Sequence, residues 1–373
     1  MPNPTVVIGA LAAALALAMP AVAKEAKVSL GVSPKHFGYT QGWEPYAKRV
    51  ETQTQGALTF RFFLGGSLFT QNASLDGLRQ GVAEATFLVM PYTPAQLPHA
   101  TFLGDMGLLG RNAKAMAGAT MEFLFNCPDC QQEFAAQNTV YLGGYSTDVF
   151  NLLCNKTVAS LADVKGRKIR SGAAGWNRWI ETLGAIPVNF PATDMMQGLQ
   201  SGAIDCTGSS ISNMNPYGLW GAATHATRLP LGTFHSLALI AFNTGFWNGL
   251  SVGERKALID NAAEAHAATT IAFMDESAEI YRVGPSKGLI IVEPKPDLVK
   301  FTAEFATQDA DRVAEDAEKR GVIRNARVKV QTFIALVRKW EGLIDAAPHD
   351  AKAVGAIYQR EIFSKLTPSA YGL

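Results

Sequence analysis

The sequence lacks the short motifs that define several large enzyme classes. It contains no His-Glu-x-x-His zinc motif, no phosphate-binding Gly-x4-Gly-Lys-Ser/Thr, no dinucleotide-binding Gly-x-Gly-x-x-Gly and no Gly-x-Ser-x-Gly nucleophile turn. Its six histidines form no pair at a metal-binding spacing, so we interpret His36 and His235 as hydrogen-bonding residues rather than catalysts. These absences favour a binding protein over an enzyme, and we expect no cofactor.

Net charge is also nearly absent. The 373 residues carry 33 Lys and Arg against 32 Asp and Glu, a formal charge of +1. This balance produces no field that would concentrate nucleic acid or anionic lipid, so we expect no polynucleotide partner. With 48% hydrophobic and 17% charged residues, the chain can bury a substantial core. Its length predicts two domains, or two lobes within one chain.

Long apolar runs are confined to the N-terminus. Residues 6–23 are apolar or small and end in Ala21-Val22-Ala23, a small-x-small pattern that a charged stretch follows at once. This combination is typical of a secretory signal, so we predict cleavage after Ala23 and a soluble mature protein in the periplasm. The alternative is an uncleaved membrane anchor, because the 18 residues 6–23 could just span a bilayer.

Cysteine is scarce, and the four residues allow three disulfide pairings in an oxidising compartment: Cys127, Cys130, Cys154 and Cys206. The Cys127-Pro-Asp-Cys130 pair lacks the second ligand pair that a zinc ribbon needs. A dithiol redox site would place the first cysteine at a helix start after a strand, where its pKa falls. Here a helix-like stretch precedes the pair instead, so we favour a local structural disulfide between Cys127 and Cys130.

Strand and helix patterns alternate along the chain after the signal segment. β-type runs at residues 28–32, 58–63 and 85–90 enclose helical periodicity at 42–55 and 73–81. After Gly143 the order repeats, with strands at 149–153, 167–170, 187–190 and 203–206 and helices at 175–183 and 194–201. Two such units predict an α/β protein with helices on both faces of its sheets.

A long helix is expected after these units. Ser251-Val-Gly-Glu254 has the spacing of a capping box and opens an Ala-rich run to about Arg282. At about 45 Å, such a helix is longer than either lobe needs and can brace both. Beyond it we expect a strand at 288–292 and helices at 297–320 and 327–346.

The segment between Leu161 and Asp205 indicates a family. It reads Leu161-Ala-Asp-Val-Lys-Gly-Arg-Lys-Ile-Arg170, then Leu183-Gly-Ala-Ile-Pro-Val-Asn-Phe190, then Asp194-Met-Met-Gln-Gly-Leu-Gln-Ser-Gly-Ala-Ile-Asp205. This run resembles the extracytoplasmic substrate-binding proteins of TRAP transporters (the DctP-like family), whose pattern is D-L-K-G-x-K-I-R, L-G-A-x-P-V and a helix reading A-L-Q-x-G-x-V-D-G. Residues 65–84 and 243–259 are similar to further segments of the family, so the resemblance covers most of residues 28–285.

The resemblance implies a two-lobed, periplasmic-binding-protein-like (Venus flytrap) fold in which the long helix spans both lobes. Lobe I would hold residues 24–147 and about 235–270, and lobe II residues 148–234 and about 271–373 with the C-terminal helices. The implied function is capture of a small organic acid between the lobes. The acid would then pass to a TRAP transporter, whose small and large integral membrane subunits use a sodium gradient.

The functional interpretation depends on Arg170. It ends a predicted strand directly before the turn at residues 171–173, so its side chain can enter the crevice at the carboxyl edge of the sheet, where α/β proteins bind ligands. A guanidinium holds a carboxylate through two parallel hydrogen bonds and stays charged at any working pH. The resemblance assigns Arg170 to the substrate carboxylate. The alternative is a structural arginine that pairs with a neighbouring acid.

Further pocket candidates come from matching positions to the family. The chain lacks the second arginine that sialic acid binders carry near Phe150 and their acidic residues near Gln71 and Val89. We therefore expect a small monocarboxylate or similar organic acid rather than a cationic or amino-bearing ligand. Trp176 and Trp220 could cover the ligand, but we interpret both as core residues. The candidates are Phe37, Gln71 and the strand end Val89 to Tyr92 from lobe I, and Phe150, Ser209, Phe234 and His235 from lobe II.

Three other classes stay open from the sequence. An exported enzyme acting on a small carboxylate would need a base near Arg170, for which Asp148 and Asp205 are the candidates. A redox or assembly factor would use Cys127 and Cys130. A solute-binding protein of an ATP-driven (ABC-type) transporter would share the cleft, although the long helix argues against it.

Overall fold

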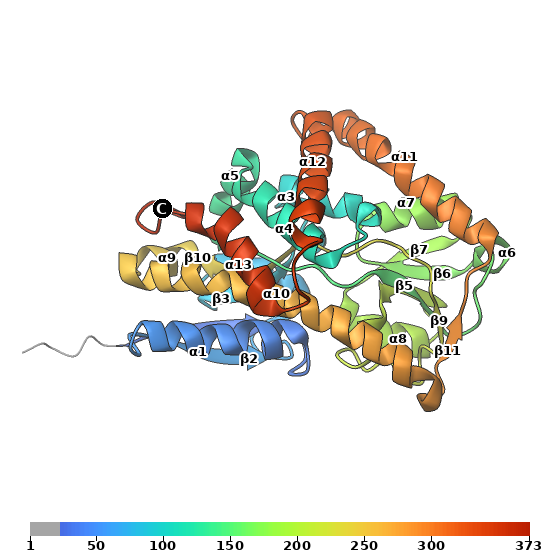
Figure 1. The fold of residues 1–373 in the computed structure, drawn as a ribbon, viewed down its shortest axis with the longest axis horizontal. Helices are drawn as coiled ribbons and strands as arrows, with labels where there is room; N and C mark the ends of the chain where they lie inside the picture. The colour runs from blue at the N-terminus through green and yellow to red at the C-terminus, as the bar shows by residue number, and fades with distance from the viewer. Residues whose placement is uncertain (1–22) are drawn as a thin grey trace, which may run out of the picture.

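The computed structural model describes residues 23–373 and consists of two α/β lobes, each built on one sheet (Figure 1). The predicted signal segment, apart from Ala23, lies outside the described residues. Within the part of the chain that the structure describes, no helix is long and apolar enough to cross a membrane. The two-lobed α/β fold confirms the architecture expected from the sequence.

Lobe I is built on a five-stranded sheet with the strand order β2-β1-β3-β10-β4. The first three strands run parallel, whereas β10 runs antiparallel to β3 and β4. All five residues of β3 are buried, as expected for a central strand with the uninterrupted sequence Ala-Thr-Phe-Leu-Val. The strands are β1 (Lys24–Leu30), β2 (Leu58–Leu64), β3 (Ala85–Val89), β4 (Thr139–Tyr141) and β10 (Leu237–Asn243).

Short helices connect the strands of lobe I. In α1 the buried residues Tyr46, Ala47 and Val50 lie on one face, which is the periodicity that the sequence shows. Single turns at Gln71–Ala73 and Met90–Tyr92 follow β2 and β3 and bring polar side chains to the sheet edge. The helices are α1 (Glu44–Gln53), α2 (Ser74–Arg79), α3 (Pro98–Phe102), α4 (Ala113–Phe125), α5 (Pro128–Ala136) and α9 (Thr244–Asn248).

Lobe II is built on a six-stranded sheet with the order β11-β9-β5-β8-β6-β7. β6 runs parallel to β7 and β8, whereas β5 runs antiparallel to β8 and β9. The strands are β5 (Phe150–Cys154), β6 (Lys168–Ser171), β7 (Ile186–Asn189), β8 (Cys206–Ser210), β9 (His225–Thr227) and β11 (Ile290–Val292). The helices are α6 (Leu161–Val164), α7 (Ala174–Thr182) and α8 (Met195–Gln200).

The strand expected at 203–206 begins later, at Cys206. The preceding Asp205 is tied to the start of β6 instead: its carboxylate accepts the backbone N–H of Lys168 at 2.9 Å, and its own N–H donates to the Lys168 carbonyl at 2.8 Å. The strand then runs through small polar residues that pack inside the lobe.

The helix α10 (Val252–Val283) spans both lobes. Its capping box forms as predicted: the Ser251 hydroxyl accepts the Glu254 N–H at 3.2 Å, and the Glu254 carboxylate accepts the Ser251 N–H at 2.6 Å. The helix packs on α1 in lobe I and on the turn Ile211–Met214 in lobe II. It has 32 residues, about 48 Å at 1.5 Å per residue.

Three C-terminal helices follow: α11 (Pro296–Arg320), α12 (Ala326–Ile344) and α13 (Ala351–Glu361). α11 packs on α7 of lobe II, α12 returns to α4 of lobe I, and α13 lies along α10 (Figure 1). The chain therefore passes back from one lobe to the other at its end. The allocation of residues 271–373 to lobe II stays a prediction.

Both cysteine pairs form disulfides. Cys127 is bonded to Cys130, as favoured from the sequence, and Cys154 is bonded to Cys206. The second bond joins residues that lie directly opposite each other on β5 and β8, and it closes a separation of 52 residues. Because β8 neighbours β6, this bond secures the sheet that carries Arg170.

Removing the longer disulfide is expected to cost more stability than removing the shorter one. The loop-entropy estimate for Cys154→Ala with Cys206→Ala is about 4 kcal/mol of unfolding free energy, and for Cys127→Ala with Cys130→Ala about 2 kcal/mol. Urea titrations of the two double variants measure both losses. Equal losses would show that loop length does not govern the contribution of these bonds.

Candidate functional site

A cavity lies between the lobes at the carboxyl edges of both sheets. The space inside it, including its mouth open to solvent, amounts to about 410 Å³. Both lobes and α10 contribute to its walls. The lining residues are His36, Gln71, Phe87, Val89, Tyr92, Tyr145, Thr147, Phe150, Arg170, Ala192, Ser209, Asn213, Tyr217, Phe234, Leu237 and Phe273.

Arg170 enters this cavity from lobe II. It lies in β6, opposite Val188 of β7 and Thr207 of β8, and is 3% exposed. Because β6, β7 and β8 run parallel, their carboxyl ends meet at one edge of the sheet, and Arg170 lies next to that edge. The strand β6 ends at Ser171, and the chain turns directly into α7 at Ala174, beside the cleft.

Neutral partners hold the guanidinium of Arg170. Nε donates to the carbonyl oxygen of Phe190 at 2.9 Å, and Nη2 donates to the Tyr92 hydroxyl at 3.0 Å. Nη1 lies 3.8 Å from the Met195 sulfur. Among residues 23–373 no carboxylate forms an ion pair with Arg170. A buried cation without an acidic partner is costly, and a bound anion would offset that cost.

Tyr92 connects the lobes beside Arg170. Its hydroxyl oxygen accepts hydrogen bonds from Arg170 Nη2 and from the backbone N–H of Ala192, both at 3.0 Å. Both donors belong to lobe II, whereas Tyr92 follows β3 of lobe I. Since its oxygen already accepts two bonds, the O–H proton of Tyr92 is left to donate to a ligand oxygen.

Aromatic rings form the walls of the cavity. Tyr145 stacks on Phe273 with ring centroids 5.3 Å apart, and Phe150 stacks on Phe234 at 5.9 Å. Burial raises the pKa of Tyr145 and of Tyr217 well above the usual value, so both phenols are neutral. The walls therefore combine flat apolar faces with hydroxyl groups that can donate.

His36 is a neutral member of the lining. It is 1% exposed, and burial lowers its pKa to about 3. Nδ1 accepts the backbone N–H of Gly38 at 3.0 Å, so the ring proton resides on Nε2. Arg170 is thus the one charged side chain among the described residues that line the cavity.

A family model matches most of the chain. Residues 30–315 match the model described as bacterial extracellular solute-binding protein, family 7 (DctP). The chain belongs to this family. Membership confirms the resemblance to TRAP substrate-binding proteins and the expectation of a binding protein rather than an enzyme.

Solved structures of TRAP solute-binding proteins share the fold of this solute-binding protein. One from Rhodoferax ferrireducens, in complex with copurified benzoate, has a TM-score of 0.77 at 18% identity and covers 86% of this chain and 99% of its own. One from Bordetella bronchiseptica with bound (R)- and (S)-mandelate has a TM-score of 0.72 at 19% identity, covering 85% and 99%. A curated solute-binding protein of Albidiferax ferrireducens is 21% identical over 269 residues, 71% of this chain and 78% of that protein.

Val89 and six other residues expected at the site line the cavity, whereas Phe37 and His235 lie outside the lining. The Phe37 ring contacts the Phe273 ring edge to face, at 5.0 Å between centroids. Both ring nitrogens of His235 face backbone carbonyls, at 3.1 Å from Thr233 and 3.0 Å from Leu103. The six are Arg170, Gln71, Tyr92, Phe150, Ser209 and Phe234.

The two tryptophans considered as lids lie outside the lining as well. Trp176 is buried behind Phe150 and Phe234, and its Nε1 donates to the Leu231 carbonyl at 2.8 Å. Trp220 is bound to the side chain of Asn215 at 2.6 Å. Trp176 is therefore a core residue, as interpreted from the sequence, whereas Trp220 is only partly buried against the core of lobe II.

Several lining residues were missed or undervalued by the sequence analysis. Tyr145 and Tyr217 lie in irregular segments that carry no periodic signal. Phe273 and Tyr281 are both large rings in the Ala-rich α10, and no local signal shows that Phe273 is the one that lines the cavity. Asn213 lies in the single turn after β8, beyond the strand that the sequence predicted.

The bases considered for an enzyme lie outside the lining. Asp205 is bound to the backbone of Lys168 at the opposite end of β6 from the cavity edge. Burial raises the pKa of Asp148, and a hydrogen bond from Ser277 on α10 opposes that shift. Over residues 23–373, no group of three His, Cys, Asp or Glu side chains is placed to hold a metal ion.

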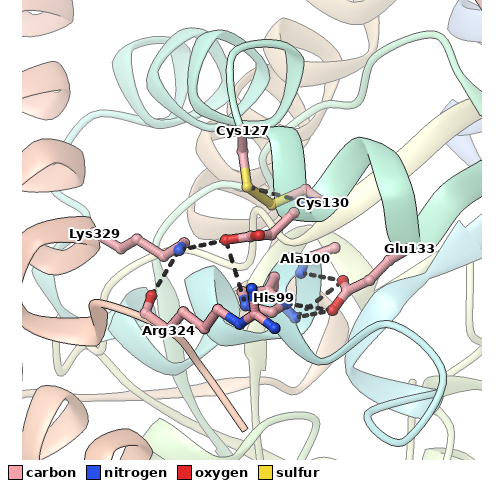
Figure 2. A network of polar contacts seen from close by, with 8 residues as sticks. His99, Ala100, Cys127, Cys130, Glu133, Arg324 and Lys329 are labelled. Atoms are coloured by element: carbon pink, nitrogen blue, oxygen red, sulfur yellow. Dashed lines mark hydrogen bonds and ion pairs between the residues drawn. A yellow bond between two sulfur atoms is a disulfide. The ribbon is translucent and has the colours of Figure 1, made fainter.

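The Cys127–Cys130 disulfide lies away from the cavity, in a polar network that Figure 2 shows. Lys329 donates to Asp129 at 2.7 Å and to the Arg324 carbonyl at 2.7 Å. Glu133 accepts the backbone N–H groups of His99 and Ala100 at the start of α3. Carboxylates thus already engage the neighbouring Lys329 and His99, which favours a structural role over a reactive dithiol.

Proposed function

We propose that this protein is the periplasmic receptor of a sodium-driven TRAP transporter and that it captures a small aromatic monocarboxylate through Arg170. Delivery would be to the small and large integral membrane subunits that the family uses. The observation that carries the proposal is the buried Arg170 guanidinium, which faces a cavity and has no acidic partner among the described residues.

The charge balance of the cavity favours a ligand with one negative charge. Arg170 contributes one positive charge, and the other described lining residues contribute none at neutral pH. A second carboxylate would therefore be buried without compensation, which costs several kcal/mol in an apolar site. A monocarboxylate removes the unpaired charge and adds none.

The walls favour an aromatic or similarly flat ligand. The stacked pairs Tyr145–Phe273 and Phe150–Phe234 present flat surfaces from both lobes and from α10. A ring placed between such surfaces gains about 0.5–1.5 kcal/mol per aromatic contact beyond its area burial. Structural relatives with bound benzoate and mandelate support this choice of ligand class.

The mechanism of capture follows from the position of Tyr92. A carboxylate on Arg170 can also accept the Tyr92 O–H, and Tyr92 belongs to the other lobe. The ligand thus binds the closed arrangement better than one in which the lobes are apart. This difference in affinity is what shifts the population toward the closed form that would dock on the membrane subunits.

A thermal-shift screen tests the proposal. At a hundred times its Kd, a ligand adds about 2.7 kcal/mol of stability, which corresponds to a rise of about 4 °C in Tm. We expect such a rise with benzoate-like acids and none with benzamide, which has the same shape without the charge. The proposal would fail if no monocarboxylate raised the Tm, or if benzamide raised it as much as benzoate.

A further inference from the structure

The cavity contains polar groups that the proposed carboxylate contact does not use. His36 is one of them, because Gly38 N–H can only donate and so keeps the His36 proton on Nε2. Among residues 23–373, no acceptor takes a hydrogen bond from His36 Nε2. The side chain therefore presents one fixed donor to the cavity that it lines.

Two carboxamides in the same lining carry unpaired oxygens. Gln71 Oε1 and Asn213 Oδ1 are buried, and neither has a hydrogen-bond partner among the described residues. Both residues are 5% exposed. Asn213 is oriented by its amide nitrogen, which donates to the Ser209 hydroxyl at 2.7 Å. Buried acceptors without donors are costly, so a ligand group that donates here is favoured.

These groups take no part in the hydrogen bonds of Arg170. His36 is surrounded by Phe87, Tyr217 and Phe273 with ring centroids 5.7 to 5.9 Å away. No hydrogen bond or ring contact joins it to Arg170 or Tyr92 in the described part of the chain. A ligand held by Arg170 would occupy the cavity whose lining also contains His36, Gln71 and Asn213.

We infer that the ligand is a hydroxylated aromatic monocarboxylate whose ring hydroxyl accepts from His36 Nε2 and donates to Gln71 Oε1. A hydroxyl group is the smallest group that accepts and donates at once, which matches one fixed donor beside unpaired acceptors. This inference rests on the proposed function and narrows the ligand class. It also makes His36 a specificity-determining residue.

Calorimetric titration with matched ligands tests the inference. 3- and 4-hydroxybenzoate are compared with 3- and 4-methylbenzoate, in which a methyl group of similar size replaces the hydroxyl. The better hydroxybenzoate is expected to bind about 10- to 100-fold more tightly than its methyl counterpart, because the methyl group leaves the buried polar groups unpaired.

Two variants test whether His36 and Gln71 cause the preference for hydroxybenzoate over methylbenzoate. His36→Phe keeps a flat ring but removes the Nε2–H donor, together with the hydrogen bond from Gly38. Gln71→Leu removes one acceptor and leaves the bond between Gly38 and His36 intact. Each is expected to reduce the hydroxyl-to-methyl affinity ratio by about tenfold or more. His266→Gln, at a buried histidine outside the lining, is the control and should keep the wild-type ratio.

The outcomes separate the inference from the proposed function. Equal binding of hydroxy- and methylbenzoates would overturn the inference and leave the receptor for aromatic acids in place. A preference that survives in both variants would overturn the assignment to His36 and Gln71. Absence of binding by every monocarboxylate would overturn the proposed function and the inference together.

Discussion

Replacing Arg170 by methionine is expected to weaken the binding of an aromatic carboxylate by about 10³-fold, equivalent to about 4 kcal/mol. The guanidinium is buried, so no solvent or neighbouring cation can take over its charge. Isothermal titration calorimetry of the wild type and of Arg170→Met measures the loss. Arg170→Lys keeps the charge but not the planar fork, and we expect it to recover only part of the affinity.

Arg170→Met is expected to weaken ligand binding without lowering the stability of the ligand-free protein. Its guanidinium has no acidic partner among the described residues, so the apolar side chain should leave the Tm of the ligand-free protein unchanged or higher. Lys168→Gln, two residues earlier on the same strand but outside the cavity, is the matched control for affinity. A loss of affinity in Lys168→Gln similar to that in Arg170→Met would show that the strand, not the guanidinium, matters.

Mild acid is expected to destabilise the protein substantially. Burial lowers the pKa of His36 to about 3 and those of His235 and His266 to about 4, against 6.5 for an unfolded histidine. A group with a lowered folded-state pKa contributes stability above the unfolded pKa and loses it as the pH falls. Each histidine therefore costs about 1.4 kcal/mol per pH unit below pH 6.5.

One carboxyl group acts against this trend. Burial raises the pKa of Asp105 from 3.8 to about 6, so its contribution to stability falls as the pH rises through that interval. Between pH 7 and pH 5 the three histidines lose roughly 6 kcal/mol and Asp105 regains roughly 1 to 2 kcal/mol. The net expectation is a loss of about 4 kcal/mol in unfolding free energy.

Urea denaturation at a series of pH values measures this loss. His266→Gln can still donate to the Leu142 carbonyl that His266 Nε2 faces at 2.8 Å, and it should reduce the slope between pH 6.5 and 5 by about a third. Asp105→Asn should make the slope steeper, because it removes the opposing group. An unfolding free energy that stays constant from pH 7 to pH 5 would contradict the assignment of neutral buried imidazoles.

Local signals in the sequence predicted much of the fold. The capping box at Ser251 marked the start of α10, and apolar periodicity located β6, α7 and α11 to within one or two residues. β10 was missed because its uninterrupted apolar run Leu-Ala-Leu-Ile-Ala-Phe fits a buried helix segment as well as a buried strand. α5 was missed because it begins at Pro128 between two cysteines, where the sequence reads as a loop.

The cavity could be predicted only in part, because its walls depend on tertiary contacts. Arg170 was located by its place at the end of a strand, a local property. His36, Tyr145 and Phe273 lie more than 100 residues apart in the sequence, and only the packing of both lobes against α10 unites them. No local pattern distinguishes a ring in such a wall from a ring in the core.

The path of α10 past both lobes has a consequence for how the receptor opens. The helix is tied to lobe I through Leu258, whose carbonyl accepts from Tyr46, and to lobe II through Ser277, which bonds Ser210. If the lobes move apart, α10 must bend between these two contacts. The hydroxyls of Thr269 and Thr270 bond the carbonyls one turn earlier, an arrangement that often bends helices. We therefore expect any bend of α10 to occur near Thr269 and Thr270, one turn before the Phe273 ring that lines the cavity.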